Sequence, residues 1–275
     1  MLGHIKYKVA RAVESHPYLW FAAWTIAHKL TFLLPHDRSY FAIRHFGGTS
    51  NHLLVDVGAN DGISALSFHK LEPDVRILSL EPNPLHRSSL QALKTRIPNF
   101  DFMMVGAGDA AAEIRLFSPY YKGIALHTFT SGSVEQVKTA VAKSFGPNVA
   151  AALEVTECAV PVIALDELNL APWVIKIDVE GFDYKVLLGA RGTLERHRPY
   201  VIVEACHAEL EPMLGYFAEL NYVVLTFDQA LNKFAHLEHG ALEYATGARN
   251  LFAVPHETVG TLPMKQTTGH IDSDR

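Results

Sequence analysis

The stretch Leu53 to Gly62, LLVDVGANDG, decides the fold of this 275-residue chain. It joins a short apolar run, in which Asp56 is the one acid, to a glycine-rich turn. The apolar run suits a strand buried on both faces, and Gly58 and Gly62 let the backbone turn sharply and approach a ligand. Open α/β sheets bind their ligands at the carboxyl ends of the strands, so this turn is predicted to border a binding site.

Strand-like and helical patterns alternate along the rest of the chain. Such alternation predicts an α/β fold with a doubly wound, mostly parallel seven-stranded sheet. The last two strands follow each other without a clear helix, which permits an antiparallel hairpin at one sheet edge. A polar bridge is expected at 36–48, before the first strand. The predicted strands cover residues 53–57, 76–80, 101–105, 173–177, 200–204, 222–227 and 250–254.

Residues 110–170 are too many for a simple crossover and predict an insertion before the fourth strand. Strand-like runs occupy 113–117 and 159–164, and a helical pattern covers 134–145. An insertion of this size usually covers a site or contacts a substrate. Ordinary surface-loop chemistry explains each of its polar residues equally well. The candidates for substrate contact are Tyr120, Tyr121, His127 and Thr128.

Composition excludes several classes of protein. The net charge is -5 and no dense Lys/Arg face is evident, which argues against nucleic-acid binding. Two cysteines, Cys158 and Cys206, cannot build a disulfide framework, and no Cys/His cluster indicates structural zinc. A cytoplasmic location is therefore expected.

The aromatic segment at 18–34, YLWFAAWTIAHKLTFLL, imitates a membrane anchor. His28 and Lys29 interrupt it, so it falls short of the ~20 apolar residues that a span needs. We expect a helix that packs on the main domain or on a partner subunit, with attachment to the inner membrane surface as the alternative. The expected division is an N-terminal helical extension (1–48), a main domain (49–260) and a disordered tail (261–275).

Acids follow the next two predicted strands. Glu81 comes 23 residues after Gly58 (81 - 58), a spacing that suits hydrogen bonds to ribose hydroxyls. Asn83, in the same EPNP segment, is expected to cap the next helix and to lie in the cofactor site. A second turn is predicted at Gly106-Ala107-Gly108-Asp109. It would place Gly108 and Asp109 beside an adenine, so that the Asp109 carboxylate accepts a hydrogen bond from the exocyclic amine.

The first turn distinguishes between adenosine cofactors. It lacks the G-x-G-x-x-G pattern of nicotinamide dinucleotide folds, and Asp61 would repel a pyrophosphate at the start of the helix. S-adenosylmethionine carries no phosphate, and its ammonium and sulfonium groups suit an acid-rich edge. A nicotinamide-dependent oxidoreductase remains the alternative enzyme, and a non-catalytic protein that docks through 18–34 remains the alternative outside enzymes.

The fourth and fifth predicted strands end in further charged residues. Lys176 and Asp178 are two apart and therefore point to one face of their strand. His207 is the first candidate for a general base, and Asp178 or Glu204 would orient it. The same three side chains could instead bind a divalent metal, which is possible but not predicted. The candidate catalytic residues are His207, Asp178, Glu204, Glu180 and Lys176.

Taken in order, these motifs resemble those of the FkbM methyltransferase family. The resemblance covers roughly 53–207, and its most specific part is the KIDVEG block; HDRSYFAIRHF at 36–46 is also similar to the lead-in of the family. The motifs that carry it are DVGANDG (56–62), EPNP (81–84), AGD (107–109), LDEL (165–168) and IKIDVEGFDYKVLLGA (175–190).

The resemblance implies a Rossmann-like class I methyltransferase that uses S-adenosylmethionine and methylates a hydroxyl of a sugar, glycoconjugate or other natural product. By this likeness, Glu81 would hold the ribose and Asp109 would flank the adenine. The aromatic segment lies outside the family pattern. The residues that would line the cofactor pocket are Asp56, Gly58, Asn60 and Gly62.

Overall fold

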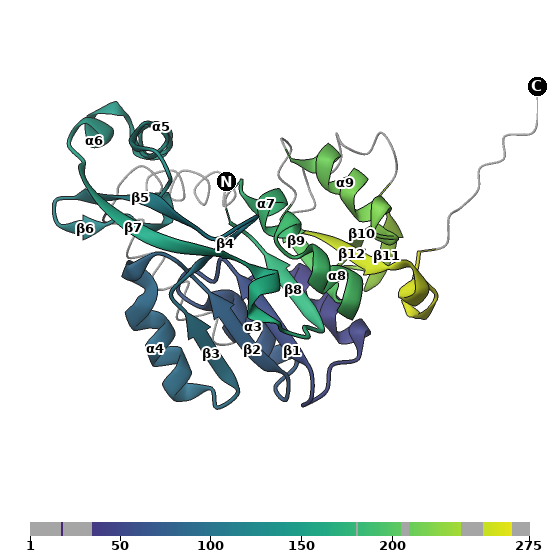
Figure 1. Ribbon diagram of the computed structural model, residues 1–275. Helices are drawn as coiled ribbons and strands as arrows, with labels where there is room; N and C mark the ends of the chain where they lie inside the picture. The colour runs from purple at the N-terminus through teal and green to yellow at the C-terminus, as the bar shows by residue number, and fades with distance from the viewer. Residues whose placement is uncertain (1–17, 19–34, 180, 205–208, 238–249, 266–275) are drawn as a thin grey trace, which may run out of the picture.

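The computed structural model describes Tyr18 and residues 35–179, 181–204, 209–237 and 250–265. Two sheets form its framework, and helices cover both faces of the larger one (Figure 1). The aromatic segment predicted as a helix lies outside the described residues, apart from Tyr18. Among the helices that are described, none is long and apolar enough to span a bilayer.

The larger sheet has eight strands in the order β11-β10-β12-β9-β8-β1-β2-β3. Neighbours from β9 to β3 pair in parallel, whereas β12 is antiparallel to both β9 and β10. The strands are β1 (Leu53–Val57), β2 (Arg76–Leu80), β3 (Phe100–Met103), β8 (Val174–Ile177), β9 (Tyr200–Glu204), β10 (Tyr222–Asp228), β11 (Lys233–His236) and β12 (Asn250–Pro255).

The doubly wound, mostly parallel class predicted from the sequence is confirmed, and all seven expected strands are present. The expected count of seven is corrected to eight, because β11 pairs antiparallel with β10 at the sheet edge. Only Phe234 of this four-residue strand is buried, so its sequence carries a weak strand pattern. The predicted hairpin is corrected: β10 and β12 do pair antiparallel, but β11 comes between them in the chain and β12 lies inside the sheet.

Apolar side chains on the two faces of this sheet form two separate cores. On one face, η1 (Arg38–Phe46), α3 (Ile63–Leu71) and α4 (Arg87–Arg96) pack against the strands. The opposite face is covered by α7 (Asp183–Leu188), α8 (Arg191–His197) and α9 (Leu210–Glu219) (Figure 1). The central strands are buried on both faces, as their continuous apolar runs predict.

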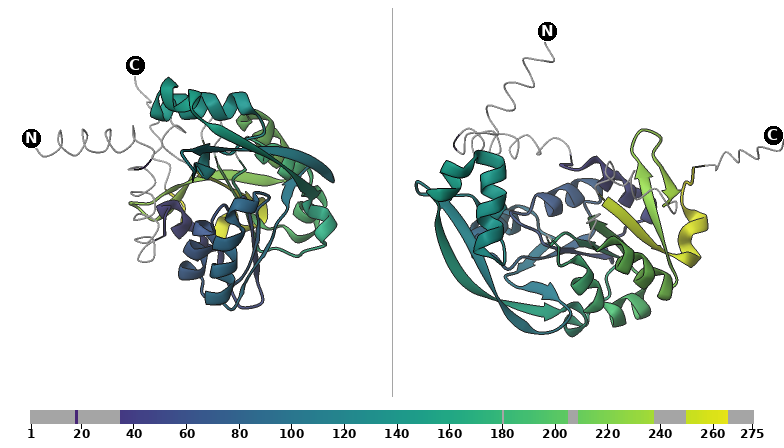
Figure 2. Two further views of the ribbon diagram at one scale, coloured as in Figure 1. Left: turned by 90° about the vertical axis from the view of Figure 1, so that its left-hand side faces the viewer. Right: turned by 90° about the horizontal axis from the view of Figure 1, so that it is seen from above.

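The insertion folds as a second sheet. Its strands are ordered β4-β7-β5-β6, and the long antiparallel pair β5·β7 reaches beyond the edge of the larger sheet (Figure 2). The predicted helix at 134–145 is confirmed, and both strand-like runs lie within longer strands. The elements are β4 (Gly106–Gly108), β5 (Ala112–Tyr121), β6 (Ile124–Ala125), η3 (His127–Phe129), α5 (Val134–Phe145), α6 (Pro147–Ala151) and β7 (Glu154–Ala164).

The polar bridge expected at 36–48 is wrong for Arg38–Phe46, which form the partly buried helix η1. Tyr40, Ile43 and Phe46 recur every three residues, which places them on one side of a 3₁₀ helix, and all three are buried. The indole nitrogen of Trp173 donates to the carbonyl of Phe46 at 3.1 Å. The division of the chain at residues 48 and 260 stays a prediction, although η1 packs on the same sheet as the main domain.

Candidate functional site

A cavity of about 720 Å³ opens at the carboxyl ends of β1, β2 and β8. The larger sheet lines it with the loops that follow these three strands, and the second sheet lines it with β5, β7 and the segment around η3. This is the place where a doubly wound sheet binds ligands. The cavity is therefore the candidate functional site.

The loop after β1 needs glycine at its first position. Gly58 has a φ of +76°, and a Cβ atom there would lie 1.9 Å from the carbonyl oxygen of Asp178. Two residues later, Asn60 also adopts a left-handed conformation, with a φ of 53°. Its side-chain Oδ1 is buried on the cavity wall and accepts no hydrogen bond from the residues that the structure describes. A ligand with a hydrogen-bond donor would satisfy this oxygen.

Glu81 closes the end of β2 and is almost fully buried. The backbone nitrogens of Asn60 and Asn83 each donate to one of its carboxylate oxygens at 2.8 Å. Burial raises the pKa of Glu81 to about 7, and these two hydrogen bonds only partly counteract the increase. Each oxygen keeps a lone pair, so the carboxylate can still accept hydrogen bonds from a ligand in the cavity.

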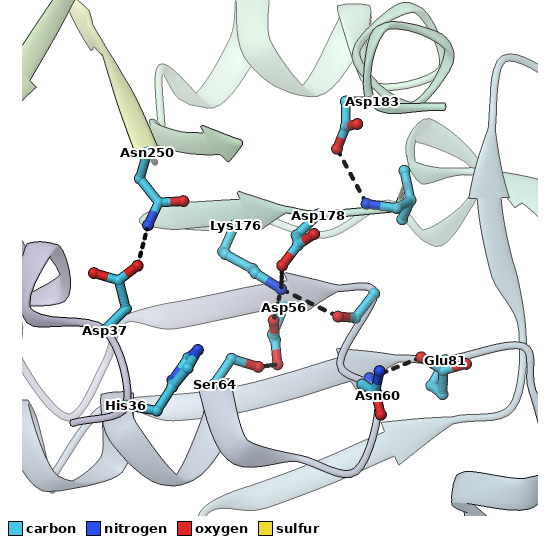
Figure 3. A network of polar contacts seen from close by, with 12 residues as sticks. His36, Asp37, Asp56, Asn60, Ser64, Glu81, Lys176, Asp178, Asp183 and Asn250 are labelled. Atoms are coloured by element: carbon cyan, nitrogen blue, oxygen red, sulfur yellow. Dashed lines mark hydrogen bonds and ion pairs between the residues drawn. The ribbon is translucent and has the colours of Figure 1, made fainter. Parts of the chain in front are cut away.

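Lys176 is the centre of a buried charge network (Figure 3). Its Nζ donates to the carbonyl oxygen of Gly58 at 3.1 Å and lies 3.3 Å from Asp56 and 3.4 Å from Asp178. Burial alone would lower the pKa of Lys176, but the two carboxylates raise it above its ordinary value. Lys176 is therefore a fixed cation that joins β1 to the strand end of β8.

Asp56 lies beneath the cavity and does not line it. Its side chain is fully buried, and one carboxylate oxygen accepts hydrogen bonds from Ser64 at 2.7 Å and Ser79 at 3.1 Å. The other oxygen faces Lys176. The structure therefore gives Asp56 a supporting position below the turn.

The loop after β8 is held by a residue that the sequence reasoning missed. Asp183 accepts hydrogen bonds from the backbone nitrogens of Val179 and Gly181 at 3.1 and 3.3 Å, the first of which is drawn in Figure 3. Burial raises the pKa of Asp183. The recurrence of acids in DVEGFD was the available signal, because an acid at the start of a helix often accepts hydrogen bonds from nearby backbone nitrogens.

Over residues 56–224, the chain matches the family described as Methyltransferase FkbM domain. This match covers more than half of the 275 residues. The chain belongs to the FkbM methyltransferase family.

Solved structures with a similar arrangement are distant from this FkbM family member. One is methyltransferase FkbM from Methylobacillus flagellatus KT, with 16% identity, a TM-score of 0.49, and coverage of 83% of this chain and 58% of that chain. Another is precorrin-6y C5,15-methyltransferase from Geobacter metallireducens GS-15, with 11% identity, a TM-score of 0.39, and coverage of 79% and 84%. An rRNA methylase from Streptococcus thermophilus has 10% identity, a TM-score of 0.38, and coverage of 83% and 94%. No curated protein matches the chain.

The predicted cofactor residues of this FkbM protein divide into two groups. Gly58, Asn60, Glu81 and Asn83 line the cavity. The side chain of Asn83 also caps η2 (Pro84–His86), as expected. The other group, which lies outside the cavity lining, consists of Asp56, Gly62, Gly108 and Asp109.

The expectation of a turn at 106–109 is corrected by the structure. Gly106–Gly108 form β4, which pairs in parallel with β7 of the second sheet, and Asp109 is exposed after it. Gly106 and Ala107 line the cavity. Two glycines in three residues look like a turn, but here they allow close packing, since a Cβ on Gly108 would lie 2.9 Å from a side-chain carbon of Val162.

The predicted catalytic residues are only partly brought together. Lys176 and Asp178 line the cavity, whereas Glu204, at the end of β9, does not. Glu180 and His207 lie outside the described residues, so their predicted roles stay predictions. Within the described part of the chain, no three His, Cys, Asp or Glu residues are grouped to hold a metal ion.

The insertion supplies much of the cavity wall. Of its four candidates for substrate contact, His127 and Thr128 line the cavity, and Tyr120 and Tyr121 do not. The Nδ2 of Asn83 donates to the hydroxyl of Thr130 at 3.2 Å, which links the loop after β2 to the insertion. The apolar part of this wall consists of Ile114, Leu116 and Val162.

Three further cavity residues were not predicted from the sequence: His36, Tyr40 and His86. The buried ring of His86 lies edge-on to that of His127, with 5.2 Å between the ring centroids. Burial, together with His127, lowers the pKa of His86 to about 4, so its ring is neutral near pH 7. His36 and Tyr40 reach the cavity from the segment at the start of η1.

Proposed function

We propose that this protein transfers the methyl group of S-adenosylmethionine to a hydroxyl of a sugar, glycoconjugate or other natural product. The observation that carries the proposal is the Glu81 carboxylate, which is held by two backbone nitrogens on the wall of a cavity at the strand ends. Membership of the FkbM methyltransferase family supports methyl transfer over nicotinamide-dependent hydride transfer.

The residues on the cavity wall fit this cofactor. Glu81 would accept hydrogen bonds from the ribose hydroxyls, and the buried Oδ1 of Asn60 would accept another from a donor on the cofactor. Asp178 offers a negative charge to the ammonium and sulfonium groups. Gly106 and Ala107 would border the adenine, and a role for Asp109 there stays a prediction.

When bound, S-adenosylmethionine supplies a methyl group made electrophilic by the sulfonium. The protein must hold the acceptor oxygen in line with this group and remove the hydroxyl proton. His207, oriented by Asp178 or Glu204, was the base predicted from the sequence. Those three residues are also the ones that would bind a divalent metal. Full activity after exhaustive chelation would exclude the metal-assisted route.

Isothermal titration calorimetry with S-adenosylmethionine tests the proposal. Glu81→Ala should weaken binding by about 1–3 kcal/mol, because the ribose loses its hydrogen-bond acceptor. Glu167→Ala, which removes an exposed carboxylate outside the cavity, is the matched control and should bind as tightly as wild type. Absence of binding by the wild-type protein would refute the cofactor, and unchanged binding by Glu81→Ala would refute the role of Glu81.

The acceptor is found by a second experiment. The wild-type protein is incubated with methyl-labelled S-adenosylmethionine and a cell-envelope or glycolipid extract, and the labelled product is isolated. Label in an ether on a carbohydrate would support the proposed acceptor class. Label that appears only on nitrogen or carbon would contradict transfer to oxygen.

A further inference from the structure

His36 lines the cavity from outside residues 56–224, the range over which the chain matches the family. It precedes η1, and its ring is exposed. Ser67, on α3, holds it in place: the Ser67 hydroxyl oxygen is 3.1 Å from the backbone nitrogen of His36 and 3.2 Å from its Nδ1. The ring also packs edge-on against Tyr40, with 5.1 Å between the ring centroids.

The hydrogen bonds of Ser67 favour one tautomer of His36. A serine hydroxyl has one proton to donate, and that of Ser67 is donated to the carbonyl oxygen of Ile63 at 2.8 Å. All three contacts of Ser67 are satisfied together when Ser67 accepts from His36 and Nδ1 carries the proton of the neutral ring. The basic lone pair then lies on Nε2, which is the form that a general base requires.

His36 belongs to the part of the cavity where the charge network lies. His36, its neighbour Tyr40, and Lys176 and Asp178 all line this cavity. In Figure 3, the ring of His36 points from the start of η1 towards these two residues. The other histidine considered for substrate contact, His127, packs instead against His86, which lies in η2 shortly after Glu81.

We propose that His36 is a catalytic residue, the general base that removes the proton from the acceptor hydroxyl. The proposal rests on the proposed function. It assigns the general base to His36, whereas the sequence alone had indicated His207. Nε2 takes the hydroxyl proton, and the hydroxyl oxygen forms a bond to the methyl carbon. The carbon–sulfur bond breaks with its electron pair on sulfur, so the products are a methyl ether, S-adenosylhomocysteine and a protonated His36 that returns its proton to solvent.

Nuclear magnetic resonance of the full chain, labelled at histidine, tests the position and tautomer of His36 without an acceptor. The His36 signals are identified by their loss in His36→Gln. We expect ¹⁵N shifts of a neutral ring protonated at Nδ1, and a change of tautomer in Ser67→Ala. We also expect different His36 signals with S-adenosylmethionine and S-adenosylhomocysteine, because only the former carries a sulfonium charge. A ring protonated at Nε2, or identical signals in both complexes, would overturn the proposal.

Methyl transfer to the glycolipid extract tests the proton transfer itself. His36→Ala should bind S-adenosylmethionine within about twofold of wild type but transfer label at least about 10²-fold more slowly. Added imidazole should restore part of the rate, which loss of a merely structural contact would not allow. His256→Ala removes an exposed histidine of η7 (His256–Thr261) outside the cavity and should behave as wild type.

Failure of this proposal is distinguishable from failure of the proposed function. A wild-type protein that binds no S-adenosylmethionine would refute both. A wild-type rate in His36→Ala would refute only the role of His36, and a comparable loss in His207→Ala alone would return the base to His207.

Discussion

Lys176 shows how single residues keep this site charged and ordered. A lysine with 2% of its side chain exposed is stable as a cation only where carboxylates and carbonyl oxygens replace water. Asp56, Asp178 and the carbonyl of Gly58 provide that replacement. The same contacts fix Asp178 at the cavity wall, so the charge network is both a stabilising and a positioning feature.

Lys176→Met should therefore destabilise the protein by about 3–5 kcal/mol, because it leaves the fully buried Asp56 carboxylate without a counter-charge. Urea unfolding followed by circular dichroism measures this loss. Lys94→Met breaks an exposed ion pair with Asp101 and should cost no more than about 1 kcal/mol. Adding Asp56→Asn to Lys176→Met should recover part of the stability, and equal costs for the two lysines would contradict this account.

Glu81 should make cofactor binding depend on pH. Burial raises its pKa to about 7, so the free protein holds a proton on Glu81 below that pH. Ribose hydroxyls need the ionised carboxylate as acceptor, so affinity should rise as pH increases to 7 and then level off. Below pH 7 it should fall up to about tenfold per pH unit, since only the ionised fraction binds. Calorimetry from pH 6 to 8 measures this, and a Glu81→Gln protein with the same slope would refute the assignment.

At the scale of elements, the close approach of β1 and β8 determines the shape of the cavity floor. Gly58 follows β1, and its backbone meets the backbone of Asp178, which follows β8. The same loop also contacts the end of β2, because the backbone nitrogen of Asn60 donates to Glu81.

Gly58→Ala should force these strand ends apart. A left-handed φ and a contact of 1.9 Å both oppose a Cβ atom there, so we expect a loss of at least about 1–3 kcal/mol in unfolding free energy and weaker cofactor binding. Gly215→Ala is the matched control, because that glycine lies within α9 and a Cβ would meet nothing within 4 Å. It should stabilise the protein by about 0.5–1 kcal/mol. A thermal melt that ranks the two variants the other way would contradict this view of the loop.

Elements whose pattern is repeated over several residues could be predicted from the sequence. The continuous apolar run of β1 and the helical pattern of α5 were both sufficient. By contrast, the buried side chains of η1 recur at a period of three between polar residues, a pattern that neither an α-helix nor a strand gives, and β4 depends on pairing with β7, about 55 residues later. Those contacts are formed by tertiary packing, and local propensity does not contain them.

The same distinction applies to the site. Glu81 and Lys176 could be recognised because motifs and strand ends mark them. His36 and His86 could not, since nothing in the local sequence shows that their segments fold back to the cavity. For Asp109, the spacing was suggestive, but β4 leads the chain into the second sheet and leaves the carboxylate exposed.

At the scale of the whole molecule, one cavity is enclosed by two sheets. The larger sheet provides Gly58, Asn60 and Glu81, and the insertion provides Leu116 and Thr130 on the opposite wall. The link from Asn83 to Thr130 crosses between these two parts of the fold. A ligand that fills the cavity should therefore tie the insertion to the larger sheet.

Hydrogen–deuterium exchange with and without S-adenosylmethionine measures this coupling. We expect slower exchange in the loop after β1 and also in β5 and the segment around η3, because both walls contact the ligand. The β10·β11 edge, which lies outside the cavity, should exchange at an unchanged rate. Protection confined to the larger sheet would contradict a shared site.

The position of β12 has a consequence for biosynthesis. This strand fills the space between β9 and β10, although it is made after both of them. On the ribosome, the sheet therefore cannot be completed until Asn250–Pro255 have left the exit tunnel, and until then β9 and β10 each present an unpaired edge to other chains. Newly made chains would need protection from aggregation until β12 has emerged and paired with both strands.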